Sequence, residues 1–292
     1  MTPLFCESPA IETACCRLLG EHLTRLLSEP IQELSGNFQD GRMRWFVDDG
    51  AGPMREVAAN VSPRAIEAIV RLLATVNGVP LDSQAPFLNC VLACGARFSA
   101  ALSPVANGVQ VSFRTHVRIL RSLLAFMAEE RAAWLKRQIL ARKNILVAGG
   151  TNTGKTTLLN SMIAEIPIQE RLAVIEDAAE LQVREGNVIR RTATDRADMK
   201  RHVKEILRMR PDRIIIGEVR GPESWDMIDA MRTGHSGGLS TIHANSAEQA
   251  LSRLAGLARC TEDVIREGIN VVLFIQRSSD GRRQVTEVKE VC

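Results

Sequence analysis

A glycine-rich segment at residues 149–157, GGTNTGKTT, has the composition and spacing of a phosphate-binding loop. It fits the pattern G-x-x-x-x-G-K-[ST], follows the apolar run NILVA and opens the helical run TTLLNSMIAEI. Small residues let the backbone wrap around a phosphate, and the N–H groups of a helix N-terminus add partial positive charge. We therefore predict a nucleotide site formed by Gly149, Gly150, Thr151, Asn152, Thr153, Gly154, Lys155, Thr156 and Thr157.

The same segment predicts the ligands ATP and Mg²⁺, because Lys155 can reach the β- and γ-phosphates and the Thr156 hydroxyl can bind the metal. Hydrolysis also needs a carboxylate near the metal and another that polarises the attacking water. Two apolar runs end in acids, LAVIED in Glu176 and Asp177 and RIIIGE in Glu218. Since ligands bind at the carboxyl ends of strands in doubly wound sheets, we predict that Glu218 polarises water and that Glu176 binds Mg²⁺ or organises the water.

Two histidines are further candidates for the same site. His243 ends the apolar run LSTIH, where its ring could sense the γ-phosphate or donate a hydrogen bond to it. His235 lies in a glycine-rich turn, TGHSGG, and is similarly placed. The pattern leaves open which of the two acts.

The elements that must position these residues follow an alternating α/β pattern. From residue 131, a helical run leads to NILVA, and helices then alternate with LAVIE, RIIIGEV, LSTIHA and NVVLFI. Strands separated by helical segments are typical of a parallel, doubly wound sheet. A last hairpin, with Asp280 and Gly281 in its turn, is expected to close the sheet edge with VTEVKEV.

Residues 1–115 indicate a smaller α+β domain. Apolar residues from Ile11 to Leu27 recur at helical spacing and predict one amphipathic N-terminal helix. Ser62 and Pro63 predict the N-cap and first residue of another helix. The runs ARFSAAL and VQVSFR predict a hairpin. We expect residues 116–130 to form a linker to the domain at 131–292.

The composition is that of a globular protein with a sizeable core: 292 residues, 45% hydrophobic, 24% charged and a net charge of +3. This near-neutral charge does not suggest a nucleic-acid partner. The seven cysteines include no C-x-x-C pair, which argues against a zinc site and is usual in a reducing cytosol. Because we find neither a signal peptide nor a membrane span, we expect a cytoplasmic protein whose membrane contact is at most peripheral.

Four motifs in order resemble the type II and type IV secretion (traffic) ATPases, the family of the PilT pilus-retraction and TrbB-type conjugal transfer proteins. They are the phosphate-binding loop, LAVIEDAAEL, LRMRPDRIIIGEVRG and TGHSGGLSTIHANS. In that family these are the Walker A loop, an acidic box, a Walker B strand carrying a glutamate and a histidine box. GARFSAAL upstream most resembles the conjugation and type IV secretion branch, the TrbB type.

The resemblance implies a RecA-like P-loop NTPase domain behind a smaller N-terminal α+β domain, and a homohexameric ring with ATP between the two domains. Domain motion on hydrolysis would move components of a conjugation or type IV secretion apparatus at the inner membrane. Carried over by position, Arg97 and Arg114 would lie near the phosphates. Arg208 and Arg220 would flank the Walker B strand, with Arg208 as a catalytic candidate.

Several other functions remain open at this point. A RecA-like nucleic-acid translocase would favour basic, aromatic-bearing loops, yet aromatic residues make up 4% of the chain and there is no tyrosine. A type IV pilus assembly or retraction ATPase is a second alternative. A scaffold without turnover would be expected to lack Lys155 or Glu218. A small-molecule kinase would not explain the histidine box.

Overall fold

The computed structural model describes residues 3–50, 52–115, 120–193, 196–278 and 280–291. These residues form two compact units, 1–117 and 118–292, and each is described by itself. Residues 116–119 of the expected linker lie outside the described residues. The rest of that segment is structured, because a 3₁₀ helix, η1 (Leu123–Ala125), and the start of α4 (Glu129–Leu140) belong to the second unit.

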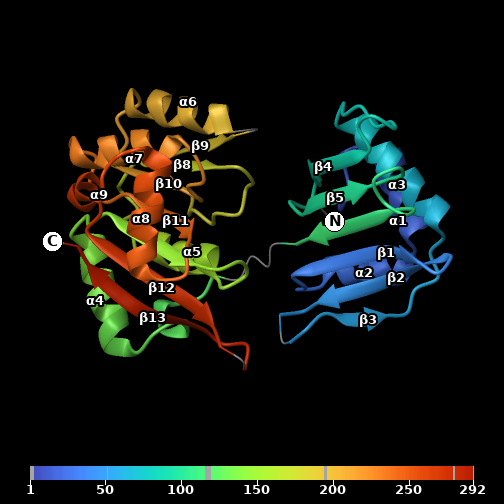
Figure 1. Ribbon diagram of the computed structural model, residues 1–292, viewed down its shortest axis with the longest axis horizontal. Coiled ribbons are helices and arrows are strands. Elements are labelled where there is room, and N and C mark those ends of the chain that lie inside the picture. Colours follow the sequence, from blue (N-terminus) through green and yellow to red (C-terminus); the bar gives the residue numbers. More distant parts are fainter. Residues whose placement is uncertain (1–2, 51, 116–119, 194–195, 279, 292) are drawn as a thin grey trace. The chain divides into compact units, whose positions relative to one another are not determined.

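The first unit is built on a six-stranded sheet with the order β3-β2-β1-β6-β5-β4, in which neighbouring strands pair antiparallel (Figure 1). The predicted hairpin is confirmed as β5 and β6, and Arg97 faces Arg114 across it. The strands are β1 (Glu33–Gln39), β2 (Arg42–Asp48), β3 (Arg55–Val57), β4 (Phe87–Val91), β5 (Arg97–Ala101) and β6 (Gln110–Arg114).

The N-terminal helix differs from the expectation, because two helices stand where one was predicted. α1 (Pro9–Leu19) and α2 (Glu21–Ser28) are separated by Gly20, whose φ of 84° cannot continue a right-handed helix. Both helices still bury one apolar side against the sheet, with Leu19 and Leu23 fully inside. The next helix, α3 (Pro63–Val76), has the predicted N-cap, since the Ser62 hydroxyl accepts a hydrogen bond from Ala65 N at 3.2 Å.

The second unit carries a seven-stranded sheet with the order β13-β12-β7-β11-β10-β8-β9. Neighbouring strands run parallel except β12 and β13, so the predicted parallel sheet and closing hairpin are confirmed. The strands are β7 (Ile145–Gly149), β8 (Leu172–Glu176), β9 (Val188–Thr192), β10 (Arg213–Ile216), β11 (Leu239–His243), β12 (Val271–Arg277) and β13 (Arg283–Glu290).

Helices cover both faces of this sheet (Figure 1). One apolar cluster joins the sheet to α6 (Arg196–Leu207), α7 (Glu223–Arg232), α8 (Ala247–Ala258) and α9 (Glu262–Gly268). A second cluster joins the opposite face to η1, α4 and α5 (Lys155–Ile163). Strand β7 shows why both faces are buried: Leu146 and Ala148 belong to the first cluster, and Ile145 and Val147 to the second. The chain therefore has the mixed α/β fold that the sequence predicted.

Candidate functional site

The glycine-rich loop joins β7 to α5, as the sequence predicted. Two of its residues adopt left-handed backbone conformations, Asn152 with φ of 59° and Gly154 with φ of 98°. Gly154 is also the N-cap of α5. At Gly149 a Cβ atom would lie 2.5 Å from the carbonyl oxygen of Ile275 on β12, so only glycine fits there without a shift. These residue types let the loop curl tightly over the start of the helix.

Lys155 is the first residue of α5, and its side chain is buried under the loop. Its Nζ donates a hydrogen bond to Gly150 O at 2.7 Å and lies 3.3 Å from His243 Nδ1. Burial lowers the pKa of Lys155 to about 8, because removing the ammonium group from water disfavours its charged form. A phosphate group at the loop would offer this ammonium group the anionic partner that a neutral carbonyl does not.

His243 lies between Lys155 and Glu218. It ends β11 and stands in register opposite Gly149 on β7. Its Nε2 lies 3.2 Å from Glu218 Oε1, a close contact that does not have hydrogen-bond geometry. Burial, followed by the charge of Lys155, lowers the pKa of His243, so the ring is neutral at pH 7. The contact with Lys155 Nζ makes Nδ1 the acceptor nitrogen and leaves the proton on Nε2.

Glu218 follows β10, which lies between β11 and β8 in the sheet. The turn that carries it is held by Thr241, whose hydroxyl donates to Gly217 O at 2.8 Å. The Glu218 Oε2 atom accepts a hydrogen bond from Arg220 at 2.7 Å, and Arg220 also donates to Asp177 at 3.0 Å. Within the described residues, Oε1 is buried and receives no hydrogen bond. One oxygen is thus anchored, and the other lies against the His243 ring without a hydrogen bond.

Glu176 is buried at the end of β8, and both of its oxygens already have partners. Oε2 accepts from the backbone N–H groups of Glu180 and Leu181 at 2.8 and 2.9 Å, while Oε1 lies 3.4 Å from Arg190. Burial raises the pKa of Glu176, and these hydrogen bonds oppose the rise. In the structure, this side chain orders the loop after β8 and forms no hydrogen bond or ion pair with Lys155 or His243. Its metal-binding role stays a prediction.

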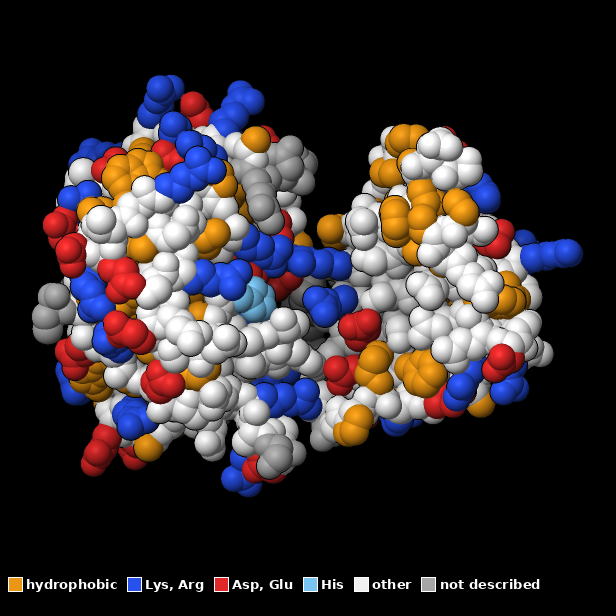
Figure 2. Space-filling view, in the orientation of Figure 1, with side chains coloured by type: hydrophobic (Ala, Val, Ile, Leu, Met, Phe, Trp, Pro, Cys, Tyr) orange, Lys and Arg blue, Asp and Glu red, His pale blue; other side chains and the backbone are white. Residues whose placement is uncertain are grey.

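Of the predicted arginines in the second unit, Arg220 contacts Glu218, whereas Arg208 pairs elsewhere. Arg208 follows α6, is 78% exposed and pairs with Glu205 at 3.5 Å. Figure 2 shows that basic side chains gather over the end of the second unit where α6 lies, at the top of the view. Arg97 and Arg114 belong to the first unit, where Arg114 lies 3.8 Å from Glu33. Their roles in nucleotide binding stay predictions.

Comparison with known proteins identifies the family. Residues 79–289 match the family described as type II/IV secretion system protein. The chain belongs to this family. It is 36% identical to the conjugal transfer protein TrbB of Rhizobium radiobacter over 281 residues, covering 91% of this chain and 85% of the relative.

Solved structures show the same fold. The VirB11 ATPase of the Brucella suis type IV secretion system, solved with sulphate, aligns with a TM-score of 0.51 at 23% identity, covering 95% of this chain and 97% of the other. The pilus retraction motor PilT with bound ADP aligns with a TM-score of 0.62 at 18% identity, covering 88% of this chain and 77% of the other. No helix in the described ranges has both the length and the apolar character to cross a bilayer.

Two further residues of this type II/IV secretion family member contact the site and were missed at the sequence level. Glu223 is buried at the first position of α7, where Oε1 accepts the backbone N–H groups of Arg220 and Gly221, both at 2.8 Å. An acid at the start of a helix, five residues after Glu218, was the available signal. Arg283 on β13 donates to Asn152 Oδ1 at 3.2 Å. Nothing in the local sequence around Arg283 indicates this contact.

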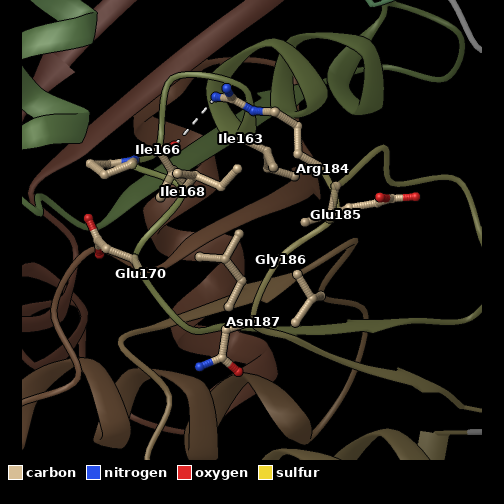
Figure 3. Close-up of a pocket in the computed structure, with 12 residues that line it drawn as sticks. Ile163, Ile166, Ile168, Glu170, Arg184, Glu185, Gly186 and Asn187 are labelled. Atoms are coloured by element: carbon tan, nitrogen blue, oxygen red, sulfur yellow. Dashed lines mark hydrogen bonds between the residues drawn. The ribbon is translucent and has the colours of Figure 1, made fainter.

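The secretion-family chain also contains a small pocket that is separate from the cluster (Figure 3). It lies at the C-terminal end of α5, lined by aliphatic side chains such as Ile163, Ile166 and Ile168, whereas Lys155 begins the same helix. Arg184 donates to the carbonyl oxygen of Ile166 at 3.5 Å beside it. This pocket takes no part in the arrangement around Lys155, His243 and Glu218.

The donor set also fits the expected metal in part. Among the described residues, no group of three or more His, Cys, Asp or Glu side chains is placed to hold a metal ion. Mg²⁺ often takes one or two protein ligands and completes its shell with phosphate oxygens and water. Of the residues predicted to hold the metal, Thr156 at the start of α5 could supply one such ligand, whereas both oxygens of Glu176 already have partners.

Proposed function

We propose that this protein is an ATP-hydrolysing motor of a bacterial conjugation or type IV secretion system. The observation that carries the proposal is the contiguous set Lys155, His243 and Glu218. The lysine of the phosphate-binding loop and the glutamate two strands away contact the same imidazole ring, at 3.3 and 3.2 Å. A nucleotide-binding loop is thereby joined to a carboxylate that can act on water, which is the minimum that hydrolysis requires.

Each residue has a distinct task in the proposed reaction. The amides of the loop and the ammonium group of Lys155 bind the β- and γ-phosphates, and the lysine exchanges Gly150 O for phosphate oxygen. The buried Oε1 of Glu218 accepts a hydrogen bond from the attacking water, while Arg220 holds the other oxygen in place. Mg²⁺, held by Thr156, would neutralise charge that develops on the phosphate oxygens.

His243 would couple the position of Lys155 to that of Glu218. Because the ring is neutral and lies against both Lys155 and Glu218, movement of the lysine toward phosphate changes what the ring contacts. Loss of the γ-phosphate would then change the contacts of the imidazole ring, and with them the position of the end of β11. This supports a site in which hydrolysis is coupled to motion rather than a site that only stores nucleotide.

The relatives support the wider setting of the proposal. A conjugal transfer protein is 36% identical over most of the chain, and the fold is shared with an ATPase of a type IV secretion system and with a pilus retraction motor. We infer a homohexameric RecA-like ring that acts in the cytoplasm against inner-membrane components of such an apparatus, with peripheral membrane contact and without direct nucleic-acid binding. ATP would bind between the two units of the chain.

Glu218→Gln tests the chemical part of the proposal. The amide keeps the shape of the side chain but cannot act as a base, so steady-state phosphate release should fall by at least about a hundredfold while ATP still binds. The matched control is Glu205→Gln on the exposed face of α6, which should leave turnover unchanged. Undiminished phosphate release in Glu218→Gln would refute the assignment of the water-polarising residue.

A further inference from the structure

One side of the β12–β13 hairpin faces α5 and ends in two arginines. Ile275 and Val285 are a register pair, and both are buried in the cluster that contains Leu158 of α5. Side chains alternate along a strand, and directly opposite residues share a face. The next pair on the α5 side is therefore Arg277 and Arg283, which are also register partners. The apolar stripe that packs on α5 thus gives way to positive charge at the end of the hairpin.

Arg283 reaches the phosphate-binding loop itself. Its Nη2 donates to Asn152 Oδ1 at 3.2 Å. A Cβ atom on Gly154 would lie only 2.7 Å from Arg283 Cδ, so the aliphatic part of the arginine covers the N-cap of α5. The absence of a side chain at Gly154 is what allows this approach. The hairpin and the loop also approach closely at Gly149 and Ile275.

This placement concentrates charge of one sign. The side chain of Arg283 stands beside the N-terminus of α5, which is itself partially positive. Lys155 adds a second cation at the same helix end. Such an arrangement becomes favourable when a polyanion binds among the positive groups.

We propose that Arg283 is a phosphate-binding residue of the nucleotide site, supplied by the C-terminal hairpin and not by the glycine-rich motif. The proposal deepens the proposed ATPase function and rests on it. Arg283 adds a charged donor from the β12–β13 side of the loop, opposite the side on which His243 and Glu218 lie: β12 and β11 flank β7 on either side. The triphosphate would then be held from two neighbouring strands as well as by the loop amides.

The test compares Arg283→Gln with Arg282→Gln, a matched loss of one charge on the same hairpin. Arg282 is 76% exposed and pairs with Asp280 at 3.4 Å, away from the loop. Calorimetric titration measures the affinity for AMP-PNP, a non-hydrolysable ATP analogue. Arg283→Gln should lower this affinity by about tenfold or more, and the affinity of Arg282→Gln should stay within about twofold of that of the unmodified chain. The dependence of affinity on NaCl should also become shallower in Arg283→Gln alone.

Two further measurements separate phosphate binding from other roles. Adenosine, which lacks phosphates, should bind Arg283→Gln as it binds the unmodified chain, and an equal loss for adenosine would overturn the proposal. Asn152→Ala removes the acceptor oxygen that Asn152 offers to Arg283 but keeps the charge of the arginine, so this variant should retain the full NaCl dependence. If Asn152→Ala reproduced both effects of Arg283→Gln, the arginine would only shape the loop and the proposal would be wrong.

The outcome also distinguishes this inference from the proposed function. If the unmodified chain bound AMP-PNP and Arg283→Gln bound it equally well, the arginine would have no phosphate role and the ATPase proposal would stand. If the unmodified chain did not bind AMP-PNP at all, the proposed function would fail and this inference with it. The melting temperature of each variant, measured without nucleotide, checks that the hairpin remains folded.

Discussion

Lys155 is the residue whose protonation depends most on what occupies the site, because its ammonium group is buried. Its partners in the structure are a neutral carbonyl oxygen and a neutral imidazole nitrogen, and neither compensates for the water lost on burial. Glu218 favours the charged lysine from a greater distance, but burial has the larger effect. Above about pH 8, the residue is therefore expected to gain a proton when an anion binds.

Nucleotide binding is expected to take up protons above pH 8. With the pKa of Lys155 lowered to about 8, most of the side chain is neutral at pH 8.5 before binding, and phosphate favours the charged form. Affinity for ATP should therefore fall as pH rises above about 8. Calorimetry at pH 8.5 in buffers of different ionisation enthalpy should report uptake of more than about half a proton per nucleotide.

Lys155→Arg provides the control for this proton uptake, because its guanidinium group stays charged throughout the range. Equal uptake in the two proteins would show that another group takes the proton. Lys155→Ala should instead lose most of the affinity for ATP, since it removes the cation altogether.

At the scale of elements, β10 connects the site to a buried ion pair at the other end of the sheet. Arg213 begins the strand that leads to Glu218, and its side chain is 0% exposed. It donates to both oxygens of Glu170 at 2.8 and 2.9 Å and to Ile139 O, near the end of α4, at 2.8 Å. The start of β10 is thereby fixed against two other segments, which holds the strand that leads to Glu218.

Arg213→Met should destabilise the second unit by about 3–5 kcal/mol, because it leaves Glu170 without its principal partner and Ile139 O without a donor. Urea denaturation followed by circular dichroism measures the loss. Arg142→Met is the matched control: Arg142 lies 3.5 Å from the same Glu170 but is 40% exposed, so its loss should cost under about 1 kcal/mol. Equal destabilisation by the two variants would contradict a dominant role for Arg213.

At the scale of the molecule, the proposed motor requires a ring of identical chains around bound nucleotide. Light scattering with AMP-PNP should give a mass six times that of the chain. Lys155→Ala, which lacks the phosphate-binding cation, should form the ring less readily under the same conditions if nucleotide contributes to assembly. A protein that remained monomeric at micromolar concentration with saturating nucleotide would argue against the hexamer.

Local sequence predicted much of the second unit, since the apolar runs and the glycine-rich loop encode single elements. The break at Gly20 was missed because apolar residues continue at helical spacing on both sides of it, and periodicity does not record one left-handed residue. The contacts of Glu176 were missed for a different reason. An acid at a strand end is compatible with metal binding and with backbone capping, and the capping contacts depend on the path of residues 177–181.

The amino-acid sequence by itself determined the glycine-rich loop, the acids at the strand ends, the alternating α/β order and the family, because each depends on residues close together in the chain. The tertiary structure decided which of these residues meet. Placing β11 between β7 and β10 brings His243 between Lys155 and Glu218, and pairing β12 with β7 brings Arg283 onto the loop. Strand order arises from packing among distant segments, so local spacing does not reveal it.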